Sequence, residues 1–178
     1  MDMNDHITPR SDEDATSQLP ALKVLINLGW KYLTQEEALS LRGGRTSEVL
    51  LYGVLEDWLR ENNRIEYRGE SVPFTEANIA SAIATLRDEQ DDGLVRTNEK
   101  IYDHLLLGRS LKQTVLGDSK SFQLKYIDWD APENNVYHVT EEFSVDRSGS
   151  DKTYRPDLVL FVNGIPLGVI ECKRSELG

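Results

Sequence analysis

The chain has 178 residues, 39% of them hydrophobic, and carries 31 acidic against 20 basic side chains, which gives a formal net charge of -11. This length predicts one domain with a core, and no apolar run approaches the ~20 residues that a membrane-spanning helix requires. The single cysteine, Cys172, excludes an internal disulfide and a cysteine-rich zinc site, and the polar N-terminus has no secretion signal, so a cytoplasmic protein is expected.

Helices are predicted for the first half of the chain. Residues 1–17 have too little apolar content to form a core, and they are expected to be a disordered acidic tail before a domain over 18–178. Capping residues and apolar spacing predict helices that begin at Ser17, Thr34, Ser47, Thr75 and Asn98. The third helix is expected to end at Asn62 and to bury one apolar stripe.

Strands are predicted after Ser119, where the apolar period becomes alternating. The runs Phe122–Tyr126 and Val136–Val145 are expected to form a hairpin across the Pro132–Asn135 loop. The runs Leu158–Val162 and Ile165–Ile170 are almost continuously apolar, which indicates a sheet covered by helices on both faces. The expected fold class is therefore α/β, with a mixed central sheet flanked by helices. Because the last strand is not followed by a covering helix before Gly178, a fragment of a longer polypeptide is expected.

Two carboxylates and a lysine stand at positions where a purely structural strand would carry apolar residues. Asp157 follows Pro156 at the start of one apolar strand, and Glu171 and Lys173 lie at the end of the other. Residues two apart on a strand share a face, so Glu171 and Lys173 are expected to point the same way and Cys172 into the packing behind them.

The register between these strands decides whether the carboxylates meet. A two-residue Asn163–Gly164 loop would pair Val162 with Ile165 and place Asp157 and Glu171 on opposite faces. A bulge or a loop of odd length is therefore predicted. A bulge with Gly164 in the left-handed conformation would bring the two carboxylates together.

This set of residues suits magnesium-dependent hydrolysis of a phosphodiester. Mg²⁺ typically takes one or two protein carboxylates, here Asp157 and Glu171, and the Cys172 carbonyl is a further candidate oxygen ligand. Lys173 would orient or deprotonate the attacking water. The structural alternative is that Glu171 and Lys173 form a salt-bridged strand end while Asp157 caps a turn, but the combination of the three favours the metal site.

The segment RPDLVLFVNGIPLGVIECKR resembles the PD-(D/E)xK nuclease motif in the N-terminal domain of the R (restriction) subunit of type I restriction-modification enzymes, the HsdR family. The likeness extends through GWKYLTQEEALSLRGGRTSEVLL, DGLVRTNEKIYDHLLLGRSL and KSFQLKYIDWDAPENNVYHVTEEFSV. It implies a restriction-endonuclease-like core that cuts double-stranded DNA, with Asp157 and Glu171 as metal ligands and Lys173 as the catalytic lysine. Glu48 is the candidate for an added acidic ligand from the first core helix, although the helix dipole alone favours a glutamate in a first turn.

The resemblance also implies partners outside this chain. The complete subunit would hydrolyse ATP to translocate DNA and would assemble with methylation and specificity subunits, whereas this chain has no GxxxxGK[ST] motif for ATP. Arg155 is a candidate phosphate contact, or it pairs with an acid such as Asp151.

Two other functions are compatible with the sequence. The acidic balance opposes DNA binding and favours a non-cutting module that docks the motor onto its partner subunits. A stand-alone nuclease of the same fold, acting on repair or recombination intermediates, is the third possibility.

Overall fold

The computed structural model describes residues 15–89, 92–146 and 153–172. Its helices are α1 (Ala15–Asn27), α2 (Gln35–Leu41), α3 (Tyr52–Asn62), α4 (Glu76–Arg87) and α5 (Leu94–Leu107), with a short 3-10 helix η1 at Pro132–Asn134. The strands are β1 (Lys31–Leu33), β2 (Arg64–Tyr67), β3 (Glu70–Pro73), β4 (Arg109–Val115), β5 (Asp118–Leu124), β6 (Tyr137–Glu141), β7 (Val145–Asp146), β8 (Thr153–Tyr154), β9 (Leu158–Val162) and β10 (Ile165–Ile170).

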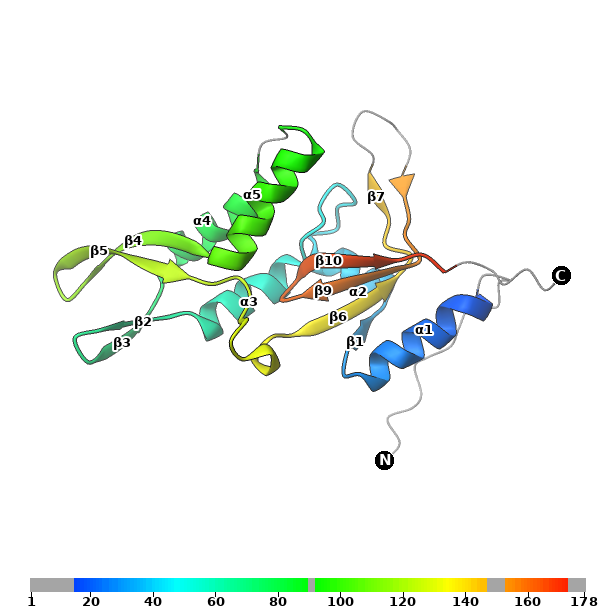
Figure 1. Cartoon of the computed structure of the whole chain (residues 1–178), viewed down its shortest axis with the longest axis horizontal. Coiled ribbons are helices and arrows are strands. Elements are labelled where there is room, and N and C mark those ends of the chain that lie inside the picture. Colours follow the sequence, from blue (N-terminus) through cyan, green and yellow to red (C-terminus); the bar gives the residue numbers. More distant parts are fainter. Residues whose placement is uncertain (1–14, 90–91, 147–152, 173–178) are drawn as a thin grey trace.

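The central sheet has the strand order β1-β6-β9-β10 (Figure 1). β1 runs parallel to β6, while β9 is antiparallel to both β6 and β10. The two faces of β9 pack against different helices, because side chains alternate along a strand. Leu158 joins a cluster with Leu22 and Leu25 of α1, whereas Val159 and Phe161 pack with residues from α2 and from the start of α3. The mixed sheet with helices on both faces confirms the expected α/β class.

The helix predictions are largely confirmed, with one correction that matters for the site. Thr34 and Glu37 form the predicted capping box of α2, and Thr75 caps α4. The helix predicted from Ser47 begins instead at Tyr52. The backbone N–H of Leu51, the residue before α3, donates to the carbonyl of Gly164 at 2.9 Å. This residue is therefore bonded to the β9–β10 turn and not to a preceding helical turn.

The strand pairing after Ser119 differs from the prediction. β5 pairs with β4 rather than with the later run, because Leu116 and Gly117 both take left-handed φ values, 50° and 83°, and close a tight local hairpin. β6 is consequently available to pair with β1 and β9. The predicted burial of both last strands is also wrong for β10, where Leu167 and Val169 are 44% and 53% exposed, because β10 is an edge strand.

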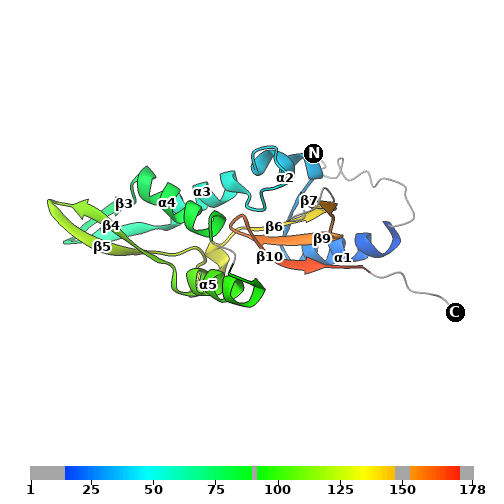
Figure 2. The ribbon, with the colours of Figure 1, turned by 90° about the horizontal axis from the view of Figure 1, so that it is seen from above.

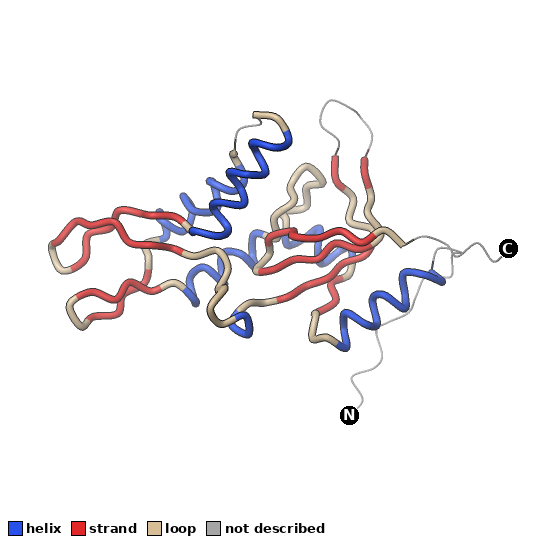
Figure 3. Tube along the Cα trace, viewed as in Figure 1, coloured by secondary structure: helices blue, strands red, loops and turns tan. Residues whose placement is uncertain are grey.

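Two hairpins, β2–β3 and β4–β5, form an arm at the end of the molecule opposite α1 (Figures 1 and 2). Figure 3 shows strands in this arm and in the central sheet, with helices between them. One large apolar cluster connects the two regions, because it includes Leu111 and Leu124 of the arm, Trp58 of α3 and Ile165 of β10. Within the described ranges, no helix combines the length and apolar character needed to span a membrane.

Candidate functional site

The predicted register change between β9 and β10 is present. Asn163 and Gly164 form a two-residue turn in which both residues have left-handed φ values, 52° and 81°. Val162 pairs with Ile165, and the register then shifts between Pro166 and Gly168. The bulge is therefore confirmed, although it lies at Leu167 within β10 rather than at Gly164.

This shift brings the two carboxylates to corresponding positions. Beyond the bulge, Val169 pairs with Val159 and Ile170 with Leu158. Neither acid belongs to a strand, but the same register, continued one step past these pairs, would set Asp157 opposite Glu171. Directly opposed residues of an antiparallel pair share a face, so the register places both acids at the same corner of the sheet.

Asp157 accepts three hydrogen bonds at this corner, which we call the acidic corner after Asp157 and Glu171. Its Oδ2 accepts a hydrogen bond from the Cys172 backbone N–H at 2.6 Å, and its Oδ1 accepts one from the Gln18 side-chain amide at 3.0 Å. Its backbone carbonyl accepts the Glu142 N–H at 3.0 Å. The half-buried carboxylate is thereby oriented by α1 and by the segment that follows β10.

Glu171 is exposed, and its Oε1 accepts a hydrogen bond from the Tyr154 hydroxyl. The next residue, Cys172, packs against the α1 cluster, as predicted. Burial raises the pKa of the Cys172 thiol, and the nearby charges of Asp157 and Glu171 raise that pKa further.

The other predicted site residues have different surroundings. Arg155 is exposed and its guanidinium lies 3.5 Å from a Glu142 oxygen, while Asp151, its predicted partner, and Lys173 lie outside the described residues. Glu48 lies in the loop before α3, where its carboxylate accepts a hydrogen bond from the Tyr52 hydroxyl and lies 3.4 Å from the Arg45 guanidinium.

The donor set fits a magnesium ion. It offers two carboxylates and the Cys172 carbonyl, which are all oxygen ligands, and Mg²⁺ usually completes its octahedron with water and substrate phosphate. In the described part of the chain, no group of three or more His, Cys, Asp or Glu side chains is arranged to hold a metal. Two carboxylates lie within the number that magnesium usually takes from a protein.

A pocket of about 130 Å³ lies beside this corner and is lined by Glu142, Thr140 and Arg42, among others. Arg42 is only 3% exposed, stacks on the Phe143 ring at 4.1 Å and donates to the carbonyls of Glu48 and Ser144 at 3.2 and 2.7 Å. Its side chain thus ties the Glu48 loop to the segment that follows β6. Burial lowers the pKa of Arg42.

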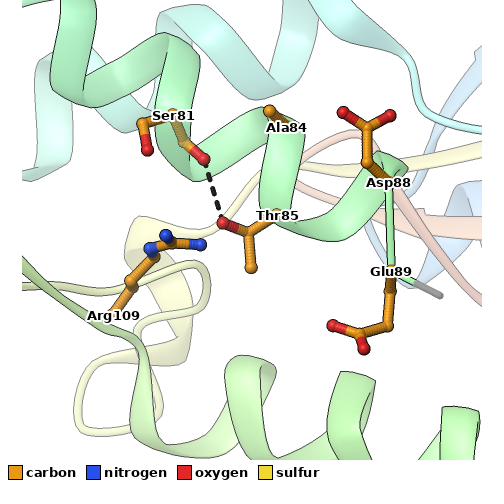
Figure 4. A pocket seen from close by; sticks show the side chains of 6 residues that line it. All are labelled: Ser81, Ala84, Thr85, Asp88, Glu89 and Arg109. Carbon is orange, nitrogen blue, oxygen red and sulfur yellow. Dashed lines mark hydrogen bonds between the residues drawn. The ribbon is translucent and has the colours of Figure 1, made fainter.

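A second pocket, of about 380 Å³, lies apart from this corner, between the end of α4 and the start of β4 (Figure 4). Arg109 and Thr85 line it together with Asp88 and Glu89, and both acids have basic partners. The two pockets have no lining residue in common. None of the residues predicted to carry chemistry lines the larger pocket.

Sequence reasoning missed three residues that shape the corner: Gln18, Tyr154 and Arg42. Gln18 reaches Asp157 across 139 positions of the chain, and no local pattern signals such a contact. Tyr154 is close in sequence to Arg155 and Pro156, but its link to Glu171 depends on where β10 ends.

Comparison with known proteins identifies the family. Residues 10–177 match the model of the type I restriction enzyme R protein N terminus. This chain belongs to the type I restriction enzyme R protein family. Three relatives of the R protein family share 27–30% identity with it: a putative type I restriction enzyme MjaIXP endonuclease subunit of Methanocaldococcus jannaschii (27% over 167 residues), the type I restriction enzyme HindI endonuclease subunit of Haemophilus influenzae (27% over 162 residues), and a putative MjaVIIIP endonuclease subunit of M. jannaschii (30% over 153 residues).

The matches cover 93%, 91% and 85% of this chain but only 15%, 15% and 13% of those relatives. The chain thus corresponds to a small part of a type I restriction enzyme subunit. The match confirms the predicted resemblance to the N-terminal domain of the HsdR family.

Proposed function

We propose that this chain is a magnesium-dependent endonuclease domain that cleaves double-stranded DNA within a type I restriction complex. The observation that carries the proposal is the β9–β10 register beyond the bulge, which, continued one step past Leu158 and Ile170, would set Asp157 opposite Glu171 at one corner of the sheet. The relatives described above are named as endonuclease subunits, which supports the same function. We place the protein in the cytoplasm, where such a complex would meet DNA.

Each residue of the corner has a proposed role. Asp157 and Glu171 would hold Mg²⁺ with the Cys172 carbonyl, and Glu48 is the candidate for an additional ligand. When bound, the metal would supply positive charge that stabilises the five-coordinate transition state at phosphorus and lowers the pKa of bound water. Gln18 and the Cys172 N–H orient the Asp157 carboxylate, because both hydrogen bonds fix its plane.

Two basic residues would complete the chemistry. Lys173 would orient the attacking water and accept its proton, in accordance with the family resemblance. Arg155 would contact a DNA phosphate, because its exposed guanidinium lies beside the corner and shares only one ion pair, with Glu142, among the described residues.

The larger assembly is part of the proposal. In a complete subunit the nuclease would be coupled to an ATP-dependent DNA translocase, and methylation and specificity subunits would choose the target. ATP would bind that translocase and not this domain. Sequence choice would then not reside in the residues described above.

The test is plasmid cleavage by the assembled complex with ATP and Mg²⁺, with ATP hydrolysis recorded in parallel. Glu171→Gln keeps an acceptor for the Tyr154 hydroxyl but removes the charge, and Asp157→Ala removes the proposed ligand. We expect both variants to lose cleavage by at least about a hundredfold while ATP hydrolysis continues, since a lost metal ligand removes several kcal/mol of charge stabilisation.

Asp103→Ala is the matched control, because Asp103 is an exposed aspartate on α5. Its cleavage should equal that of the wild type. Undiminished cleavage by Asp157→Ala and Glu171→Gln would refute the catalytic assignment and would favour the docking role.

A further inference from the structure

The β4–β5 hairpin is a two-stranded ribbon with two different faces. One face is apolar: Leu111, Val115 and Leu124 belong to the large core cluster, and Phe122 packs edge-on against Tyr67 of β2 with ring centroids 5.9 Å apart. The opposite face points away from this core, because successive side chains of a strand alternate. That outward face is made of three cross-strand pairs, namely Ser110 with Gln123, Lys112 with Ser121, and Thr114 with Ser119.

All six of these outward side chains are exposed, and all six lie in the described part of the chain. None of them is acidic, four carry hydroxyl groups, and Lys112 is the only charged one. Arg68 and Lys125 are paired with Asp118 and Asp130, whereas Lys112 has no ion-pair partner among the described residues. The face therefore presents a row of hydroxyl and amide groups around one available ammonium.

The charge distribution of the chain makes this ribbon unusual. Residues 109–125 contain four basic side chains and a single acidic one, Asp118. The following residues, 126–146, contain six acidic side chains and no lysine or arginine. A polyanion would be repelled by most of a chain with a net charge of -11, and the ribbon is a segment in which basic side chains outnumber acidic ones.

We infer that the outward face of the β4–β5 ribbon binds the backbone of duplex DNA. This inference rests on the proposed nuclease function, which makes DNA the substrate. Lysine, serine, threonine and glutamine are side chains that contact the phosphate oxygens of a duplex. The ribbon is accessible to a duplex from outside, because the arm projects at the end of the molecule opposite α1 (Figures 1 and 2).

The ribbon lies far from the acidic corner, and this position indicates how it would contribute to DNA binding. Asp157 bonds to Gln18 of α1, so the acidic corner and the ribbon lie at opposite ends of the molecule (Figure 1). A duplex that contacts both would lie along the long axis of the domain. The ribbon therefore positions DNA without selecting its sequence, since contacts with phosphates do not discriminate between bases.

The experiment measures binding of a fluorescent duplex of roughly 30 base pairs to the full 178-residue chain in EDTA, at several KCl concentrations. Lys112→Gln should weaken binding several-fold at low salt and reduce the slope of log affinity against log salt by about 0.9, the value for one phosphate contact. Ser121→Asp, which sets a carboxylate opposite Lys112, should weaken binding at least as much. Two duplexes of unrelated sequence should be affected equally.

Lys23→Gln is the matched control, because it makes the same change in net charge at an exposed position of α1. It should bind as the wild type does. Wild-type affinity in both Lys112→Gln and Ser121→Asp would overturn the inference, as would an equal loss in Lys23→Gln or no salt-sensitive binding by the wild-type chain.

The result is independent of cleavage. Because EDTA removes the metal, duplex binding is measured without cleavage, and the ribbon variants are tested apart from the proposed metal ligands. Loss of binding in the ribbon variants together with undiminished cleavage by Asp157→Ala would refute the catalytic assignment and keep the ribbon. The reverse pattern would refute the ribbon and keep the nuclease.

Discussion

His138 of β6 has a buried ring nitrogen, Nδ1, with no hydrogen-bond partner among the described residues. The side chain is 8% exposed, and burial lowers the pKa of His138, with Lys31 on the neighbouring strand lowering it further. The folded chain therefore keeps this imidazole neutral at a pH where the unfolded chain would protonate it. Stability from this group is complete above the ordinary histidine pKa of 6.5 and is lost as the pH falls below it.

We expect His138→Gln to reduce this acid sensitivity. Urea unfolding at about pH 7.5 and about pH 5.5 should show a larger loss for the wild type than for the variant, by up to about 1.4 kcal/mol per pH unit below the unfolded-state pKa. His104→Gln is the control, since His104 is a helix residue beside Glu89, at 3.3 Å. Equal losses in the wild type and His138→Gln would show that the buried imidazole does not control the acid response.

At the same scale, sequence reasoning identified which residue types carry the chemistry but not what surrounds them. Asp157 and Glu171 are visible because acids at the ends of apolar strands are unusual. The partners Gln18 and Tyr154 are not visible, because a hydrogen bond across 139 residues depends on how α1 docks on the sheet. The apolar spacing predicts a helix that includes Glu48, but α3 begins at Tyr52, after Leu51 has bonded to Gly164. Glu48 therefore lies in the loop before the helix.

At the scale of elements, the β9–β10 turn joins the proposed site to the helices. Asn163 is completely buried, and its side chain bonds to the backbone of Val136 and Tyr126 at 2.8 and 3.0 Å. Gly164 lies so close to α3 that an added Cβ would be 2.6 Å from the Leu51 carbonyl oxygen. Any residue with a side chain would push the turn away from the helix.

Gly164→Ala should therefore be strongly destabilising, and Gly69→Ala supplies the comparison. Both glycines are the second residue of a left-handed two-residue turn, with φ values of 81° and 84°, but an added Cβ at Gly69 would meet nothing within 4 Å. We expect Gly69→Ala to lower the free energy of unfolding by about 1–2 kcal/mol from φ strain alone. Gly164→Ala should cost at least about 2 kcal/mol more, measured by urea denaturation, and equal losses would exclude the close contact.

Elements were predictable where the signal is local. The bounds of β9 and β10 follow from their apolar runs, and the α2 cap follows from Thr34 and Glu37. The pairing of β6 was not predictable, because its partners β1 and β9 are chosen by the packing of distant segments. The alternating pattern predicts a hairpin between β5 and the later run, but the tight turn at Leu116 and Gly117 pairs β5 with β4 instead.

At the scale of the whole molecule, the arm and the central sheet share one core. Leu124 of β5 is completely buried in the cluster that also contains Trp58 of α3 and Ile165 of β10. Because this cluster joins the arm to the sheet, the two regions are expected to unfold in one cooperative step. The arm would then unfold with the sheet rather than as a separate unit, which gives the proposed DNA contact a rigid base.

Leu124→Ala tests this connection from the arm side. The lost packing should lower the free energy of unfolding by about 2–5 kcal/mol. Urea transitions followed by tryptophan fluorescence and by far-ultraviolet circular dichroism should move to the same lower midpoint, because the sheet loses its support together with the ribbon. Leu116→Ala, at the exposed tip of the same hairpin, should leave both midpoints nearly unchanged. Two separate transitions in Leu124→Ala would instead show that the ribbon is an independent unit, since only then can the arm unfold while the sheet persists.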